Sequence, residues 1–301
     1  MAEWIDLVDP SEDELRRKLP EDLHARALDQ LLEEYVHDDE PRPTLETHGS
    51  YVFGVLLVAV AAPDEDKVYY QEIDLILTEN TLVTVSKTPP GEEPFDPAPA
   101  KDRCRSDDSA GMYLFHLVDT VAERYLDLID ALNDEIDELE DAVDTSPARE
   151  VRERISDLRH DMLKIRRTLN PTRDAVHKVM DNRVELEGSE LFPREVELHF
   201  ADAYDKLLRA TESLELSRDL VAGVRDYSQA KISNDQNEVM KRLTVIASLL
   251  LLPTFIVGLY GQNFRHHFPE LDWQYGYAFS WGLIVATTIG QLVFFRWKRW
   301  I

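Results

Sequence analysis

Two apolar runs near the C-terminus are the strongest feature of the hydrophobic pattern. Residues 243–260 and 277–295 form runs of 18 and 19 residues that contain no Asp, Glu, Lys or Arg. At a rise of about 1.5 Å per residue, a helix over each run just crosses a hydrocarbon core roughly 30 Å thick. The pattern predicts an integral membrane protein in which residues 243–301 form two spans that cross the lipid bilayer.

The first part of the chain mixes helix and strand patterns. Residues 10–18 and 22–34 carry helix signals, and runs rich in Val, Ile, Leu and Tyr predict strands at 51–60, 68–77 and 81–86. Residues 89–108 are rich in proline and charge, which is typical of a linker. We therefore expect residues 1–110 to form an α+β cytoplasmic domain with a linker at its end.

Residues 111–242 have the pattern of a helical stalk. Residues 127–144 carry nine acidic residues and no basic one, whereas 148–180 are rich in Arg and Lys. Opposite net charges favour an antiparallel hairpin of two helices, although exposed ion pairs are individually weak.

One long helix is predicted from about residue 194 to 260, on the order of 100 Å in length. Its first half carries an apolar seam at alternating spacings of four and three, which is typical of helices that pack around an axis and can pair with copies of themselves. The seam consists of Val196, Phe200, Ala203, Leu207, Ala210, Leu214, Ser217, Val221 and Val224.

Charge and composition exclude several functions. The net charge is -26, with 59 acidic and 33 basic residues, and such a surface repels nucleic acid. The chain has no Gly-x-x-x-x-Gly-Lys run, which argues against nucleotide binding. The single cysteine, Cys104, suits a reducing compartment. The acidity itself is compatible with a halophile-like surface or with a reservoir that concentrates divalent cations.

The flanks of the two spans predict their orientation. Basic residues precede the first span and follow the second, whereas the loop between them holds Arg265 alone. The acidic N-terminus has no signal-peptide pattern. We therefore expect a protein of the cell membrane (inner or plasma membrane) with both termini in the cytoplasm.

A single face of the first span could line a pore. Met240, Leu243, Ala247, Leu251, Thr254 and Gly258 follow at spacings of 3, 4, 4, 3 and 4, which places them in one stripe. The stripe is apolar at its cytoplasmic end, where it could gate by dewetting. Many membrane helices are apolar on every face, so the stripe alone does not decide this.

The loop after the first span opens with Gly261-Gln262-Asn263, and the residues around it resemble the CorA family of divalent-cation channels. The resemblance covers nearly the whole chain. It is carried by Trp4-Ile5-Asp6-Leu7, Arg42-Pro43-Thr44-Leu45-Glu46, Asp134-Glu135-Ile136-Asp137, Phe200-Ala201-Asp202-Ala203-Tyr204-Asp205, Asn237-Glu238-Val239-Met240-Lys241, Thr254-Phe255-Ile256, Tyr260-Gly261-Gln262-Asn263-Phe264, Pro269-Glu270-Leu271, Tyr275-Gly276-Tyr277 and Lys298-Arg299-Trp300-Ile301.

The resemblance implies a homopentameric funnel whose first spans line the pore. It implies an outer filter of Gly261, Gln262 and Asn263 that holds hydrated Mg²⁺, which loses water reluctantly. Polar pore rings are then expected at Thr254 and Asn237. The same resemblance implies hydrophobic constrictions at Met240, Leu243 and Leu251, and regulatory Mg²⁺ sites that involve Asp202, Asp226 and Asp29.

The sequence departs from the family pattern at the filter. Gln262 stands where methionine is usual, and Arg265-His266-His267 follows where an acidic residue is common. The sequence therefore does not fix the identity of the conducted ion. The leading hypothesis is passive influx of Mg²⁺ gated by intracellular Mg²⁺. The alternatives are a Zn²⁺, Co²⁺ or Ni²⁺ transporter that could couple to protons, and a membrane-anchored sensor that does not conduct. An enzyme is not expected, because the acidic residues repeat along a helix and do not converge on a nucleophile.

Overall fold

The computed structural model describes residues 2–20, 23–36, 40–62, 67–262 and 273–301. The chain divides into two compact units, Met1–Arg225 and Asp226–Ile301. One element, the helix α6 (Arg194–Tyr260), belongs to both. Each unit is described by itself below.

A five-stranded sheet forms the base of the first unit. Its order is β1-β5-β4-β3-β2, in which β1 runs parallel to β5 and the other neighbours are antiparallel. The three predicted strands are confirmed as β3, β4 and β5, and two short edge strands were not predicted. The strands are β1 (Glu3–Val8), β2 (Thr44–Thr47), β3 (Val52–Ala62), β4 (Lys67–Leu77) and β5 (Thr81–Lys87).

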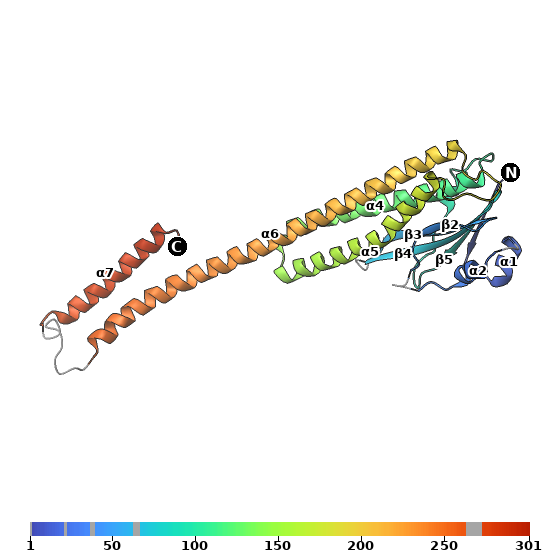
Figure 1. The fold of residues 1–301 in the computed structure, drawn as a ribbon. Coiled ribbons are helices and arrows are strands. Elements are labelled where there is room, and N and C mark those ends of the chain that lie inside the picture. The colour runs from blue at the N-terminus through green and yellow to red at the C-terminus, as the bar shows by residue number, and fades with distance from the viewer. Residues whose placement is uncertain (1, 21–22, 37–39, 63–66, 263–272) are drawn as a thin grey trace. The chain divides into compact units, whose positions relative to one another are not determined.

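Helices cover both faces of this sheet (Figure 1). The short helices α1 (Glu12–Lys18) and α2 (Ala25–Leu32) cover one face, where Leu15 and Leu31 are buried against Ile76 and Val83 of the sheet. The other face packs on the long helices α4 (Ala110–Thr145) and α5 (Ala148–Met180) in one continuous core. The α+β domain and the helical stalk that we predicted therefore share their hydrophobic core.

A buried ionic cluster lies between β4 and β5. The strand register pairs Glu72 with Lys87, and the Lys87 Nζ lies 2.6 Å from Glu72 Oε1 and 3.1 Å from Asp74 Oδ2. The pKa of Asp74 is raised to about 8, mainly by burial and in part by the nearby Glu72 carboxylate, while Lys87 acts in the opposite direction. Burial alone would lower the pKa of Lys87. The opposite effect of the Asp74 and Glu72 carboxylates is larger, so the pKa of the lysine is raised.

The segment that we expected to be a linker is packed in the first unit. It contains the short helix α3 (Ala98–Lys101), and the side chains of Phe95 and Ala100 are buried. Arg103 forms ion pairs with Asp119 and Glu123 of α4. Residues 89–108 are thus a docked connection between sheet and stalk, and buried apolar side chains hold them in place.

The helices α4 and α5 form the expected hairpin, with only Ser146 and Pro147 between them. Apolar side chains along the facing sides of the two helices are buried in the common core. Ion pairs are a minor part of the contact, since Arg154 lies 3.8 Å from Glu135 and 3.9 Å from Glu138. Charge complementarity predicted the right pairing, and hydrophobic burial supplies most of its stability.

The seam of α6 is buried within its own chain. All nine seam residues are at most 6% exposed, and the apolar ones belong to the core shared with α4 and α5. The Ser217 hydroxyl donates to Asn133 of α4 at 2.5 Å. Our expectation that the seam pairs with copies of itself is therefore wrong, because α4 and α5 of the same chain already cover it.

The second unit consists of the remainder of α6 and the helix α7 (Gly276–Trp297). These two helices contain the two apolar stretches that are long enough to cross a membrane. The helices have 67 and 22 residues.

Candidate pore helix and cation site

The predicted pore stripe is part of a broader exposed apolar surface of α6 in the second unit. Met240, Leu243 and Leu251 are 58%, 57% and 67% exposed. Ala247 is half-buried, and Asn237, Thr254 and Gly258 are exposed. Large apolar side chains that a single chain leaves open on one helical face need cover from lipid or from other copies, unless they surround a pore.

The opposite face of α6 is covered. Val245 and Ile256 are each 6% exposed, and their spacing of 11 residues, close to three turns, puts them on one side. On this side the carbonyl of Ser248 accepts a hydrogen bond of 3.1 Å from Gln291 of α7. The stripe residues lie about half a turn away from Val245 and Ile256, so α7 leaves the stripe free.

Thr254 presents an acceptor on the stripe. Its hydroxyl donates to the carbonyl of Leu250 at 2.7 Å, which is the usual bond of threonine within a helix. Because the proton is engaged in this bond, the lone pairs of the oxygen remain for other donors or cations. A ring of such oxygens from several copies would suit a hydrated divalent ion.

The C-terminal end of α6 carries the first two of the three residues that the sequence predicts for the outer filter. The backbone N–H of Gly261 donates to the carbonyl of Val257 at 2.9 Å, and Gln262 follows in an exposed, non-helical position. The last carbonyls of a helix carry partial negative charge, which favours a cation at this end. Asn263 and the Arg265-His266-His267 segment lie outside the described residues.

The expected regulatory acids stand on different elements. Asp29 lies on α2 and Asp202 on α6, both exposed in the first unit, whereas Asp226 begins the second unit. In the described part of the chain, none of the three belongs to a group of three metal-ligating side chains within one copy. Among the described residues, one copy therefore brings no two further His, Cys, Asp or Glu ligands to any of these acids.

An ionic network fixes α6 against α4. Lys206 Nζ lies 2.6 Å from Asp119 Oδ1 and 2.9 Å from Glu123 Oε1, and Arg103 binds the same two carboxylates. Burial opposes ionisation of Glu123, but hydrogen bonds from Arg103 and Lys206 outweigh it and lower its pKa. The sequence analysis missed this network, since its members are far apart along the chain.

The sequence analysis also missed a cluster of three ligating side chains. Cys104, Asp108 and His116 offer ligand atoms that all lie within 4.8 Å of one another. Their spacing, Cys-x₃-Asp-x₇-His, matches no familiar metal motif, so the sequence alone gave no usable signal. Only the folding of the connection onto α4 brings them together.

Comparisons with known proteins agree with this geometry. Residues 2–299 match the family described as CorA-like Mg2+ transporter protein. The chain belongs to the CorA family.

Among its CorA relatives is the cobalt/magnesium transport protein CorA of Thermotoga maritima, which is 30% identical over 93% of this chain and 77% of the relative. A putative metal ion transporter, YfjQ, of Bacillus subtilis is also 30% identical, over 86% of this chain and 78% of its own. The complete structure of the CorA magnesium transporter from Methanocaldococcus jannaschii has the same fold, with a TM-score of 0.79 at 22% identity over 99% of this chain and 91% of the other.

Proposed function

We propose that this protein is a passive channel for divalent cations, with Mg²⁺ as the principal ion, in the membrane of the cell. The observation that carries the proposal is the open stripe on α6 opposite the face that α7 covers. Family membership makes transport the expected activity. The membrane potential supplies the driving force, about 2.3 kcal/mol per elementary charge for each 100 mV.

The channel is a homopentamer whose first spans surround the pore. Support comes from apolar side chains on α6 outside the membrane stretch: Leu198, Leu216, Leu220 and Tyr227 are exposed in one chain. Their spacings of 18, 4 and 7 residues are each close to whole helical turns, so they form one exposed stripe along α6. Contact with neighbouring copies would bury this second stripe.

The pore stripe contains hydrophobic constrictions and polar rings at different heights along the pore. Met240, Leu243 and Leu251 form hydrophobic constrictions, and Asn237 and Thr254 form polar rings on the path of the ion. At the outer mouth Gly261, Gln262 and Asn263 hold Mg²⁺ through its water shell, because the ion dehydrates reluctantly. Both termini face the cytoplasm, in agreement with the basic residues that flank the two spans.

Intracellular Mg²⁺ closes the channel through acidic side chains between copies. Asp202 on α6 and Asp29 on α2 are exposed and carry no third ligand of their own chain among the described residues. A bound ion would pull two copies together when the cytoplasmic concentration is high, and its loss would let them separate. Asp226 contributes to the same response at the start of the second unit.

Cysteine substitution tests the pore assignment directly. The chain has one cysteine, so Cys104→Ala gives a background without thiols. On that background we expect Cd²⁺ to block Mg²⁺ flux into proteoliposomes through Leu251→Cys but not through Ile246→Cys. Both side chains are largely exposed, at 67% and 58%, but a separation of five residues places them about 140° apart around α6, so Ile246 lies off the pore stripe. Equal block at both positions would disprove a pore on the Leu251 face.

Ion-resolved flux separates the alternatives. Mg²⁺, Zn²⁺, Co²⁺ and Ni²⁺ are offered separately, with and without a pH gradient. Zn²⁺ flux that needs the gradient, without any Mg²⁺ flux, would support a proton-coupled transporter. If Asn263→Ala leaves uptake unchanged, the filter assignment fails and a membrane-anchored sensor becomes the better interpretation.

A further inference from the structure

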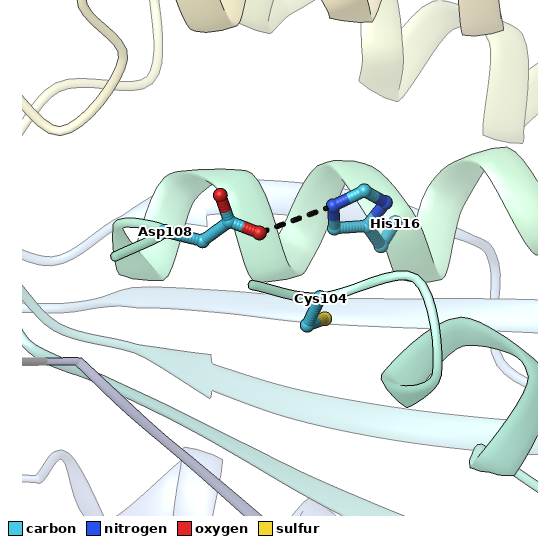
Figure 2. Close-up of side chains that lie close together, drawn as sticks. All are labelled: Cys104, Asp108 and His116. Carbon is cyan, nitrogen blue, oxygen red and sulfur yellow. Dashed lines mark ion pairs between the residues drawn. The ribbon is translucent and has the colours of Figure 1, made fainter. Parts of the chain in front are cut away.

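A second group of metal-ligating side chains lies far along the chain from the proposed pore. Figure 2 shows the carboxylate of Asp108 facing the imidazole of His116, with Cys104 beside them. Cys104 follows α3, Asp108 lies in the turn before α4, and His116 stands on the second turn of α4. All three side chains are half-buried, so they are shielded but still reachable from water.

The distances within the group suit a small metal ion. His116 Nε2 lies 3.4 Å from Asp108 Oδ2, close to the separation of two ligands about 2.0 Å from a tetrahedral ion. The Cys104 sulfur lies within 4.8 Å of a ligand atom of each of the other two residues, so a modest movement of one side chain completes three ligand positions. Water would occupy the fourth.

Local contacts orient the ligands. Asp108 Oδ2 accepts a hydrogen bond of 2.7 Å from the backbone N–H of Arg105, which fixes the carboxylate in the turn. The Cys104 thiol donates to the carbonyl of Ala100 at 3.4 Å, a weak bond that a metal could replace. Such supporting hydrogen bonds are typical of metal sites.

The neighbouring cations are engaged elsewhere. Lys101 lies over the Trp4 ring and 3.9 Å from Asp6, and Arg103 binds Asp119 and Glu123. Burial lowers the pKa of His116, which favours the neutral ring that binds metals.

We propose that Cys104, Asp108 and His116 form a binding site for a thiophilic divalent ion of the Zn²⁺ and Co²⁺ class in the first unit. Binding forms a metal–sulfur bond and releases the thiol proton to solvent, with no change in oxidation state. The resulting site is neutral, since the thiolate and the carboxylate balance the ion. Mg²⁺ is excluded, because it prefers oxygen ligands and has little affinity for sulfur.

The site would stiffen the connection between sheet and stalk. It links the turn before α4 to a residue one helical turn ahead of Asp119, and Asp119 holds Lys206 of α6. The proposal does not rest on the pore assignment, because it concerns binding in the first unit and needs no transport.

Cobalt spectroscopy on the full-length protein in detergent tests the site. Cys104 is the only thiol in the chain, so a charge-transfer band between sulfur and Co²⁺ reports this residue alone. We expect the band to saturate at one Co²⁺ per chain. The d–d bands in the visible range should have the high intensity of tetrahedral Co²⁺. Equimolar Zn²⁺ should abolish it, and a large excess of Mg²⁺ should leave it unchanged.

Variants decide whether all three residues act together. Cys104→Ser should abolish the band, and Asp108→Asn and His116→Gln should each weaken Co²⁺ binding at least about tenfold. His199→Ala is the matched control, because His199 also packs on Phe115, next to His116, but is not part of the group. His266→Ala with His267→Ala removes the loop histidines and should not change the band. No charge-transfer band, or a band unaffected by both Asp108→Asn and His116→Gln, would overturn the proposal.

Discussion

At the scale of single residues, Gln262 is the position at which we expect the proposed filter to select its ion. It is exposed at the end of α6, where helix carbonyls already attract cations. An amide offers both a donor and an acceptor to the water shell of an ion, whereas a methionine thioether offers only a weak acceptor. The side chain therefore influences how the shell is held.

We expect Gln262→Met to conduct Mg²⁺ but to change the ratio of Mg²⁺ to Co²⁺ flux several-fold. The measurement is ion-resolved uptake into proteoliposomes beside the native protein. Gln229→Met, at an exposed position on the same helix, is the control and should behave like the native protein. Unchanged selectivity at Gln262 would refute its role in the filter.

Asp74 gives a residue-scale prediction for stability. Its folded pKa is about 8 and its ordinary value is 3.8, so the folded chain keeps a proton that the unfolded chain has lost. The stabilisation that results is complete below pH 3.8 and disappears as the pH rises towards 8. Stability relative to Asp74→Asn, which cannot ionise, should therefore fall between pH 5 and 8.

Between pH 5 and 8, the free energy of unfolding of the native protein should fall by on the order of a few kcal/mol relative to Asp74→Asn. Thermal unfolding of both proteins in detergent at several pH values measures it. Asp29→Asn, an exposed change on α2, serves as the control and should track the native curve. Parallel curves for the native protein and Asp74→Asn would contradict the assignment.

At the scale of elements, the seam of α6 is buried in the core that it shares with α4 and α5. Phe200 is fully buried and packs edge-on against both Phe115 and Phe192. Phe200→Ala should cost about 3–5 kcal/mol of unfolding free energy, because it leaves a cavity in a close-packed core.

Denaturant unfolding of the full-length protein in detergent checks this value. Leu163→Ala removes an exposed side chain of α5 and should cost less than about 1 kcal/mol. If the two variants were equally stable, the seam would not be the intrachain contact described above.

Periodicity predicted the long elements well and the short ones badly. The patterns over 148–180 and 194–260 matched α5 and α6 closely, because many turns repeat the same signal. Edge strands β1 and β2 have six and four residues and half-exposed side chains, so their alternation is too short to stand out. They form strands because β1 pairs with β5 and β2 pairs with β3.

An apolar pattern is easier to predict from the sequence than the surface that packs against it. The seam was identified residue by residue, yet the sequence could not say whether its cover came from another copy or from α4 and α5. The same limit applies to Cys104, Asp108 and His116, which only the docked connection brings together. The filter at Gly261 and Gln262 stays a prediction from the resemblance, because a ring of residues around a pore needs neighbouring copies of the chain.

At the scale of the whole molecule, the exposed stripe on α6 outside the membrane stretch predicts assembly with other copies. This stripe consists of Leu198, Leu216, Leu220 and Tyr227. Leu216 is 60% exposed in one chain, in the middle of that stripe. Leu216→Arg would place a charge in each interface of the proposed pentamer, where desolvation is costly. We expect smaller assemblies, measured by native mass spectrometry or light scattering.

Leu163→Arg is the matched control, since Leu163 is similarly exposed but lies on α5 outside the stripe. It should leave the assembly intact. A pentamer that survives Leu216→Arg would show that the stripe has another role.

The buried cluster of Glu72, Asp74 and Lys87 has a calorimetric consequence. One lysine serves two carboxylates, so the folded first unit holds an extra proton near neutral pH that the unfolded chain releases. The buffer must take up this proton during unfolding. The heat of unfolding will therefore depend on the ionisation enthalpy of the buffer, and its slope will count the proton held inside the sheet.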